Sequence, residues 1–375
     1  MKILYVTARW DPKDPDSGAG VNYNAFMALK GWADQIQIAG PYNIKLTLFE
    51  RFIEKAASIF TKKRLIKFYP SYLRNSNAMV QALVDEYKPD VIFSKSSVPL
   101  SNVRISTPFI YMCDSTVKWV TENWPIFTKL GLKVMKRWER KTIKKASHII
   151  SFSQANADIL QTYYNIPSRK ITVHPIPSSL PHDDDNFQPK PIGSGYPLRL
   201  LLVGKEYHRK GVDVAIEATQ QLNAAGISTE LRIVGQDNEN SNHVCFMGLY
   251  KKKDPVQLKK YMDNYRWAHF LLFPSRFDAA GIVPSEAAGF GVPTITNAAG
   301  GLATTVKDGV SGEVLPKDSP AQSYANRLEF YWNHPKEYQS LCESTYKRYQ
   351  VELTWDALGN RLQQIILNVL RETSN

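Results

Sequence analysis

Two lysines in the second half of the chain stand where a loop would join a strand to a helix. Lys205 and Lys210 lie five residues apart, after the apolar run at 198–204 and before a helical stretch that begins near residue 212. On such a loop two ammonium groups can converge on a diphosphate and donate charge-assisted hydrogen bonds to it. A solvated basic loop accounts for the same spacing, so both interpretations stay open at this point.

Two carboxylates follow a later apolar run. Asp278 and Glu286 are eight positions apart, with Gly281 between them and an alanine-rich helical start from Ser285. Carboxylate oxygens accept hydrogen bonds from the hydroxyls of a ribose or a hexose. Acidic residues also stabilise helix N-termini by interacting with the helix dipole. The pattern therefore predicts either a sugar-binding pair or a structural cap.

Candidates in the first half are a glycine turn and one aspartate. Gly18 and Gly20 precede a helical stretch, and such a turn can bring backbone N–H groups close to a phosphate. The spacing does not match the dinucleotide-binding fingerprint, so a purely structural turn fits equally well. Asp114 follows the apolar run at 108–112 and could orient a substrate hydroxyl or cap a helix.

The elements that must position these residues are short apolar runs alternating with helical segments. The predicted strands lie at 2–7, 36–40, 90–94, 108–112, 148–152, 171–175, 198–204, 231–235, 244–248, 269–275, 293–297 and 312–315. Near-continuous apolar runs are typical of parallel strands covered on both faces. A segment rich in Pro and Gly, 178–197, separates two such series. We therefore predict an α/β protein with two doubly wound domains, whose ligands bind at the carboxyl ends of the strands.

The length and charge of the chain support this division. The 375 residues exceed one usual domain, and the net charge is +12. Residues 1–180 contain 26 Lys and Arg but only 13 Asp and Glu, whereas the remainder is nearly neutral. The stretch 129–145, taken as a helix, places basic side chains within an arc of about 100°. These are Lys129, Lys133, Lys136, Arg137, Arg140 and Lys144. They form either a solvated helix face or a contact surface for anionic lipid or an anionic acceptor.

Several classes of protein are disfavoured. The three cysteines are too scattered for a disulfide scaffold or a zinc module. The first apolar run is interrupted by Arg9 and Asp11, which argues against a secretory signal, and no run approaches the roughly 18 apolar residues of a membrane span. The positive charge is not accompanied by a nucleic-acid-binding motif. We therefore expect a cytoplasmic protein, at most peripheral on the inner face of a membrane, without a nucleic-acid partner.

Taken together, these segments resemble the family 4 retaining glycosyltransferases, also called glycosyl transferases group 1. The family motif G-R-x-x-x-x-K-G is similar to Gly204-Lys205 followed by Lys210-Gly211. Its Glu-x7-Glu signature is similar to Asp278-x7-Glu286, which is followed by G-V-P at 291–293 and G-G at 300–301. The turn at 18–21 resembles the glycine loop of the family.

The resemblance implies a GT-B fold, in which two Rossmann-like domains face a central cleft. The implied domains are an acceptor-side domain at 1–180, a linker at 181–197 and a nucleotide-sugar-binding domain at 198–354. A C-terminal helix at 355–375, with Thr354 as its N-cap, would pack back toward the first domain. The implied activity is transfer of a hexose-type sugar from a nucleotide-sugar to a glycan, lipid-linked or small hydroxyl acceptor, with retention of anomeric configuration. The implied co-substrate is the nucleotide-sugar, with no metal or other cofactor.

Roles for individual residues follow from the same resemblance. Lys205 and Lys210 would neutralise the donor diphosphate, Glu286 would hold the ribose hydroxyls, and Asp278 would hold sugar hydroxyls. The donor would also be lined from the second domain by Gly204, Ala280, Gly281 and Ile282. Gly18 and Gly20 would approach the diphosphate from the first domain.

Three departures from the family pattern leave alternatives open. Lysine stands at 205 in place of arginine, which exchanges a bidentate fork for a point charge, and aspartate stands at 278 in place of glutamate. Asp114 stands where many relatives have histidine, and it is the candidate for orienting a hydroxyl in catalysis. The departures at Lys205 and Asp278 motivate one alternative, a sugar-binding pseudoenzyme without activity. A second alternative is a nucleotide-sugar 2-epimerase, which can share the fold.

Overall fold

The computed structural model describes residues 1–15, 17–123, 125–181 and 187–374. The chain divides into two compact units. Unit 1 comprises Met1–His174 together with the C-terminal segment from Leu358, and unit 2 comprises Pro175–Ala357. Of the segment expected to be a linker, His182 to Asn186, with its three aspartates, lies outside the described residues.

Unit 1 is built on a parallel sheet with the strand order β2-β1-β3-β4-β5-β6. Its strands are β1 (Lys2–Val6), β2 (Gln35–Ala39), β3 (Val91–Ser94), β4 (Phe109–Cys113), β5 (His148–Ser151) and β6 (Ile171–Val173). Every residue of β3 and β4 is buried, as expected for central strands covered on both faces. The order reverses between β1 and β3, which creates a crevice at their carboxyl ends.

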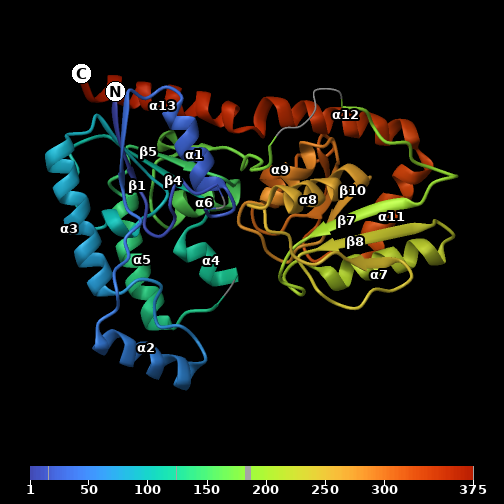
Figure 1. The fold of residues 1–375 in the computed structure, drawn as a ribbon, viewed down its shortest axis with the longest axis horizontal. Coiled ribbons are helices and arrows are strands. Elements are labelled where there is room, and N and C mark those ends of the chain that lie inside the picture. Colours follow the sequence, from blue (N-terminus) through green and yellow to red (C-terminus); the bar gives the residue numbers. More distant parts are fainter. Residues whose placement is uncertain (16, 124, 182–186, 375) are drawn as a thin grey trace. The chain divides into compact units, whose positions relative to one another are not determined.

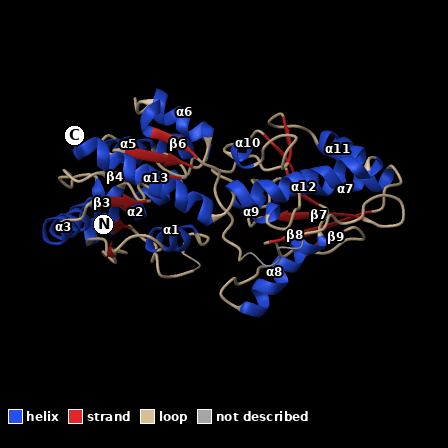
Figure 2. Ribbon diagram, turned by 90° about the horizontal axis from the view of Figure 1, so that it is seen from above, coloured by secondary structure: helices blue, strands red, loops and turns tan. Residues whose placement is uncertain are grey.

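Helices cover both sides of this sheet (Figure 2). They are α1 (Val21–Lys30), α2 (Leu48–Thr61), α3 (Pro70–Tyr87), η1 (Val98–Leu100), α4 (Val117–Asn123), α5 (Lys129–Ile143), α6 (Gln154–Thr162) and η2 (Ser168–Lys170). Helix α2 is an outlier in position, because it lies at the margin of unit 1, beyond the N-terminal end of α5 (Figure 1).

Unit 2 is built on a second parallel sheet with the order β12-β11-β10-β7-β8-β9. Its strands are β7 (Leu198–Val203), β8 (Thr229–Val234), β9 (Val244–Phe246), β10 (Phe270–Phe273), β11 (Thr294–Asn297) and β12 (Gly312–Leu315). Its helices are α7 (Val212–Ala224), α8 (Pro255–Trp267), α9 (Ile282–Ala288), α10 (Leu302–Thr305), α11 (Ala321–Asn333) and α12 (Pro335–Glu352). Helices α7 and α8 lie on opposite sides of β7 and β8 (Figure 1), so alternate residues of these strands enter two separate cores.

The last helix, α13 (Trp355–Ser374), runs from the end of unit 2 into unit 1. Thr354 accepts a hydrogen bond from the Ala357 N–H at 3.2 Å and so caps the helix, as the sequence predicts. Leu358, Leu362 and Ile366 are fully buried, and Gly359 lies close to Ala28 of α1. A larger side chain at 359 would therefore lift the helix from this contact.

The predicted α/β class with two doubly wound parallel sheets is confirmed. Each predicted strand is present, and its ends differ from the predicted ones by at most two residues. None of the helices in the described part of the chain combines the length and the apolarity that a membrane span requires.

Candidate functional site

The candidate residues of unit 2 gather where the strand order reverses, between β7 and β10. The loop after β7 and the loop after β10 are joined side by side: the Arg276 N–H donates to the Arg209 carbonyl at 2.8 Å, and the Arg209 guanidinium donates to the Phe277 carbonyl at 2.8 Å. Two segments separated by about seventy residues of sequence therefore form one loop platform at the carboxyl ends of the strands.

Lys210 and Asp278 meet on this platform. The Lys210 ammonium donates to Asp278 Oδ2 in an ion pair, and the Gly281 N–H donates to Asp278 Oδ1 at 3.3 Å. The Lys210 side chain is largely buried, with its ammonium 4.7 Å from the centre of the Phe273 ring. Gly204 makes room for it, since a Cβ at that position would lie 2.5 Å from Lys210 Cγ. The family's glycine and lysine positions are thus coupled by packing.

Glycines hold the Asp278 backbone in place. Gly300 has a φ of +67°, and a Cβ there would lie 2.1 Å from the Asp278 carbonyl oxygen, which accepts from the Gly301 N–H at 2.8 Å. Gly281, with a φ of +72°, precedes α9 and has the left-handed conformation that favours glycine. Gly300 is therefore needed because the backbone passes close to the Asp278 carbonyl, and Gly281 because of its positive φ and because a Cβ there would lie 2.6 Å from the Leu302 side chain.

Glu286 lies on α9 with a fully satisfied carboxylate. Its Oε2 accepts hydrogen bonds from the hydroxyls of Tyr261 and Tyr265 at 2.7 and 2.8 Å, and its Oε1 pairs with the Lys252 ammonium at 2.7 Å. Glu286 is 1% exposed, whereas the Lys252 side chain is 31% exposed. Burial, and after it the Glu286 carboxylate, raises the pKa of both tyrosines well above its ordinary value. Oε2 is thus held by two buried hydroxyls, whereas Oε1 is paired with the partly exposed ammonium of Lys252.

The remaining predicted residues of unit 2 have different surroundings. Lys205 is exposed and makes no hydrogen bond or ion pair within the described ranges. Ala280 is buried and its carbonyl accepts from the Thr305 hydroxyl, and Ile282 is the partly buried first residue of α9. Lys205 is therefore not joined to Lys210 and Asp278, although it stands on the same loop as Lys210.

The three partners of Glu286 were not predicted from the sequence. Tyr261 and Tyr265 are four residues apart on α8, so they share one helix face, and Lys252 precedes that helix. The tyrosine spacing was visible in the sequence, but a buried aromatic pair is more often plain core. Only the fold brings α8 against α9.

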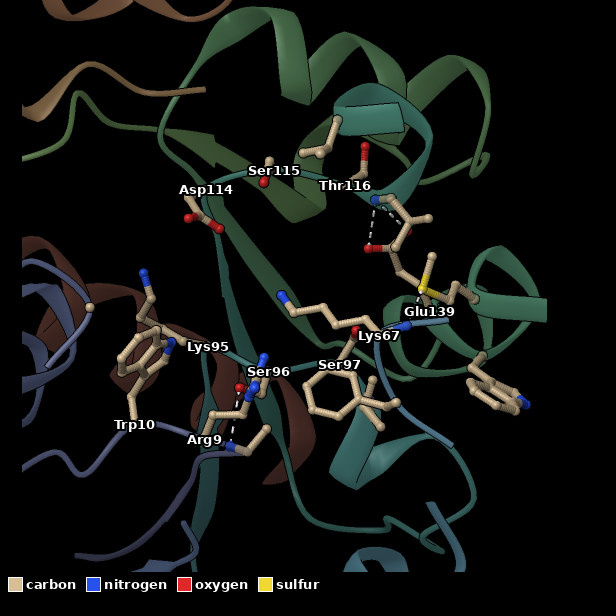
Figure 3. A pocket seen from close by; sticks show the side chains of 18 of the residues that line it. Arg9, Trp10, Lys67, Lys95, Ser96, Ser97, Asp114, Ser115, Thr116 and Glu139 are labelled. Atoms are coloured by element: carbon tan, nitrogen blue, oxygen red, sulfur yellow. Dashed lines mark hydrogen bonds between the residues drawn. The ribbon is translucent and has the colours of Figure 1, made fainter. Parts of the chain in front are cut away.

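Unit 1 contains a pocket of about 290 Å³ at the carboxyl ends of β1, β3 and β4 (Figure 3). Three loops supply most of its polar wall: Arg9 and Trp10 after β1, Lys95 to Ser97 after β3, and Asp114 to Thr116 after β4. This is the crevice expected where the strand order reverses. Two predicted residues, Gly18 and Asp114, line it.

The glycine turn bounds the same pocket. Gly18, Ala19 and Gly20 all have positive φ values, of 58°, 58° and 82°, and Gly20 is the residue before α1. A Cβ on Gly18 would lie 2.6 Å from the side-chain nitrogen of Asn22, a buried residue that also lines the pocket. Asp114 does not cap α4, because the Trp119 N–H donates to the Thr116 hydroxyl instead.

The pocket brings three cations close to two carboxylates. Arg9, Lys67 and Lys95 line it together with Asp114 and Glu139 (Figure 3). Desolvation lowers the pKa of both Lys95 and Lys67. The nearby Asp114 carboxylate opposes both of these shifts. Three cationic side chains thus share the pocket with only two carboxyl groups. The resulting excess of positive charge favours an anionic ligand.

Glu139 is a buried residue that lines this pocket. It is 3% exposed and accepts hydrogen bonds from the Val117 N–H at 2.9 and 3.0 Å and from the Tyr164 hydroxyl. Burial raises the pKa of Glu139 to about 7, because the hydrogen bonds compensate only part of the lost hydration. In the described ranges, no group of three or more His, Cys, Asp or Glu has an arrangement that could hold a metal ion.

Two family profiles match the chain, one on each unit. The family described as "Glycosyltransferase Family 4" matches residues 47–177, and the family described as "Glycosyl transferases group 1" matches residues 184–348. The chain is 29% identical over 232 residues to a D-inositol 3-phosphate glycosyltransferase of Catenulispora acidiphila, an alignment that covers 54% of this chain and 53% of the relative. The chain thus spans about half the length of the curated relatives it matches.

Solved structures share the whole fold at low sequence identity. WaaG, a glycosyltransferase involved in lipopolysaccharide biosynthesis, has a TM-score of 0.63 at 17% identity, covering 97% of this chain and 99% of WaaG. HepE of Anabaena, in complex with UDP-glucose, has a TM-score of 0.62 at 14% identity, covering 98% of this chain and 100% of HepE. The paired family matches, the two sheets and the Gly204–Lys210 and Asp278–Glu286 motifs agree: the chain belongs to the group 1, or family 4, glycosyltransferases and has the GT-B fold.

Proposed function

We propose that the chain transfers a hexose-type sugar from a nucleoside diphosphate sugar to a hydroxyl of a glycan or lipid-linked acceptor. The observation that carries the proposal is that Lys210 and Asp278 meet where the strand order of unit 2 reverses. Gly204 and Gly300 leave the space that these two residues occupy. HepE, a structural neighbour, is described in complex with UDP-glucose, which supports a donor of this class.

Lys210 is the residue that would neutralise the leaving diphosphate. Breaking the glycosyl bond leaves negative charge on the phosphate oxygens, and a preorganised cation nearby lowers the energy of that transition state. Asp278 holds the Lys210 ammonium in position, and the exposed Lys205 supplies a second cation when the diphosphate binds. With two lysines in these roles, the proposed reaction needs no metal ion, and it proceeds with retention of anomeric configuration as in the family.

Glu286 would receive the ribose hydroxyls through Oε1. Tyr261 and Tyr265 fix the carboxylate through Oε2, so its orientation survives ligand binding. Lys252 is partly exposed and can release Oε1 to a ribose hydroxyl. Asp278, whose Oδ1 is held only by a long hydrogen bond of 3.3 Å from Gly281, would accept from a sugar hydroxyl.

The pocket of unit 1 would bind an anionic acceptor. Arg9, Lys67 and Lys95 would contact its phosphate or carboxylate, and Asp114 would orient the attacking hydroxyl. One relative is named for D-inositol 3-phosphate, a phosphorylated polyol, which supports an acceptor of this kind. The positive charge concentrated in residues 1–180 suits the same class of acceptor.

The test compares variants once a donor has been identified. A thermal-shift screen of UDP, GDP, ADP and their sugars identifies the nucleotide, since a ligand stabilises the protein that binds it. We expect Lys210→Ala and Glu286→Ala each to abolish donor turnover while remaining folded, and Lys307→Ala, an exposed lysine of the same unit, to retain it. Unchanged turnover in both site variants would refute the assignment. Lys95→Gln should raise the acceptor KM without altering donor affinity.

A further inference from the structure

Helix α2 exposes an apolar face that no other element of the described chain covers. Its large apolar residues Leu48, Phe49, Phe52, Ile59 and Phe60 are between 66% and 86% exposed. On a helix at about 100° per residue these side chains fall within an arc of about 120°, so they form one continuous stripe. We call them the α2 stripe. Contiguous exposed patches of this kind mark interaction surfaces rather than ordinary protein surface.

The opposite face of α2 is anchored firmly to unit 1. Thr47 and Glu50 form a reciprocal capping box, and Glu50 is buried, accepting from the Ser71 N–H at 2.9 Å and from its hydroxyl at 2.5 Å. Glu54 accepts hydrogen bonds from the Leu65 N–H and the Tyr69 hydroxyl. The orientation of the helix is therefore fixed, and the α2 stripe faces outward because the other side is held by specific polar contacts.

Cations surround the stripe, and the acids on the helix are turned away from it. The exposed basic residues of this region are Lys45, Arg51, Lys55, Lys62, Lys63 and Arg64. Glu50 is buried and Glu54 pairs with Arg64 at 3.5 Å, so of the charges named here the two acids of the helix offset only that of Arg64. Close to the loop that follows α2, the start of α5 adds another exposed apolar side chain, Leu130, and another exposed cation, Lys129.

We propose that the α2 stripe docks on the headgroup region of an anionic phospholipid bilayer. Exposed Phe and Leu on one helix face with flanking Lys and Arg are the features of a helix that lies in the membrane interface. The apolar rings leave water while the surrounding cations approach anionic headgroups. A second copy of this chain fits less well, because it would bring an identical ring of cations against the first.

Docking through α2 has a consequence for the pocket in unit 1. The segment that leaves α2 reaches Lys67 and Phe68, which line the pocket, and Phe127 and Met135 belong both to the pocket and to the apolar cluster beneath this segment. The pocket and the docking face thus share one structural support.

The experiment measures co-sedimentation of the full chain with vesicles of phosphatidylcholine, with and without phosphatidylglycerol. The test variant is Phe49→Ser/Phe52→Ser/Phe60→Ser. The matched control is Leu249→Ser/Val256→Ser/Val351→Ser, which removes three similarly exposed apolar side chains from unit 2. We expect binding of the wild type to the anionic vesicles, a loss of roughly 30-fold or more in the test variant, and a change within about twofold in the control.

Further arms make the outcome decisive. Lys62→Gln/Lys63→Gln should weaken binding only to the vesicles that contain phosphatidylglycerol and should make it less sensitive to salt. Absence of wild-type binding to anionic vesicles, or equal binding by the test variant, would overturn the proposal. A dimer in light scattering that disappears in the test variant would also overturn it, in favour of a second copy. Nucleotide thermal shifts, which involve unit 2, should be unaltered in the test variant, so this test can fail independently of the proposed transfer reaction.

Discussion

The ion pair between Lys210 and Asp278 offers the sharpest test of how unit 2 handles a diphosphate. The substitution Lys210→Met keeps a stem that fills the space left by Gly204 and removes only the charge. The two side chains are 10% and 17% exposed. Losing one partner of a fully buried pair costs about 3–5 kcal/mol, and residual hydration reduces the expected loss here to about 2–3 kcal/mol in the free energy of unfolding.

The same substitution should weaken nucleotide binding. A charge-assisted hydrogen bond contributes about 1.5–3 kcal/mol, so the dissociation constant for the nucleoside diphosphate should rise by about 10- to 150-fold. Asp278→Asn should act in the opposite direction on the nucleoside diphosphate alone, because the Lys210 ammonium no longer has to leave a carboxylate. For the nucleotide-sugar, Asp278→Asn should weaken binding, since the proposed acceptor of a sugar hydroxyl is lost.

The double variant Lys210→Met/Asp278→Asn completes a cycle. Urea denaturation should give a coupling free energy of about 1–3 kcal/mol between the two positions, because the second substitution removes a charge that the first left unpaired. Titration calorimetry with the diphosphate and with its sugar measures the binding side. A coupling near zero, or a Lys210→Met variant that binds the diphosphate as tightly as the wild type, would refute the reasoning.

Three further predictions concern other buried groups. Glu286→Gln should lower the free energy of unfolding by about 2 kcal/mol and weaken nucleotide binding, because three donors converge on the Glu286 carboxylate. Urea denaturation measures the stability and calorimetry measures the binding. An unchanged nucleotide affinity would argue against the ribose contact. Burial raises the pKa of Glu139 to about 7, so the contribution of its protonated form to stability is fully present below the unfolded pKa of 4.5 and is lost as the pH rises through 7. The melting temperature should therefore fall from pH 5 to pH 8, and Glu139→Gln should flatten this pH dependence. Parallel curves of melting temperature against pH for the wild type and Glu139→Gln would contradict the prediction. Gly300→Ala should lower the free energy of unfolding by about 2 kcal/mol more than Gly226→Ala. Both glycines have a positive φ, but only a Cβ at position 300 would clash with the Asp278 carbonyl. Equal melting temperatures of the two variants would exclude that clash.

The sequence was sufficient to predict the strands and the loops at their ends. Near-continuous apolar runs are typical of parallel strands covered on both sides. The glycines at 204, 281 and 300 lie where the backbone or a side chain approaches too closely for a Cβ. The resemblance to the family implied that Lys210 and Asp278 each contact the donor, but their ion pair was not predicted. Its physical cause, two crossovers that leave the sheet in opposite directions, appears only once the strand order is known.

The partners of Glu286 and the pocket of unit 1 could not be predicted in this way. Tyr261, Tyr265 and Lys252 reach Glu286 from another helix and the loop before it, and no local pattern encodes that contact. Glu139 lies in the helix whose basic residues were the ones considered in the sequence, and its burial depends on packing against Tyr164. Such groups are recognised only after the tertiary contacts remove water from them.

The basic helix of unit 1 was predicted only in part. Lys129, Lys133 and Arg137 of α5 are exposed, as a contact surface requires. Arg140 instead packs its guanidinium 4.9 Å from the centre of the Tyr163 ring and donates to the Tyr163 carbonyl at 3.0 Å. The apolar face of α2 was not predicted from the sequence, because apolar residues at helical spacing are usually buried and only the fold shows that this face is exposed.

The most direct test of the central claim is acceptor-dependent sugar transfer by the purified chain, followed by NMR with the identified nucleotide-sugar and a phosphorylated or lipid-linked acceptor. We predict that nucleoside diphosphate is released in step with a new glycosidic bond on the acceptor, that the anomeric configuration of the donor is retained, and that Lys210→Met abolishes both signals. Scrambling of the donor without an acceptor would indicate an epimerase, and the absence of any product with every donor that binds would indicate a sugar-binding protein without activity. Either result would contradict the proposed transfer reaction.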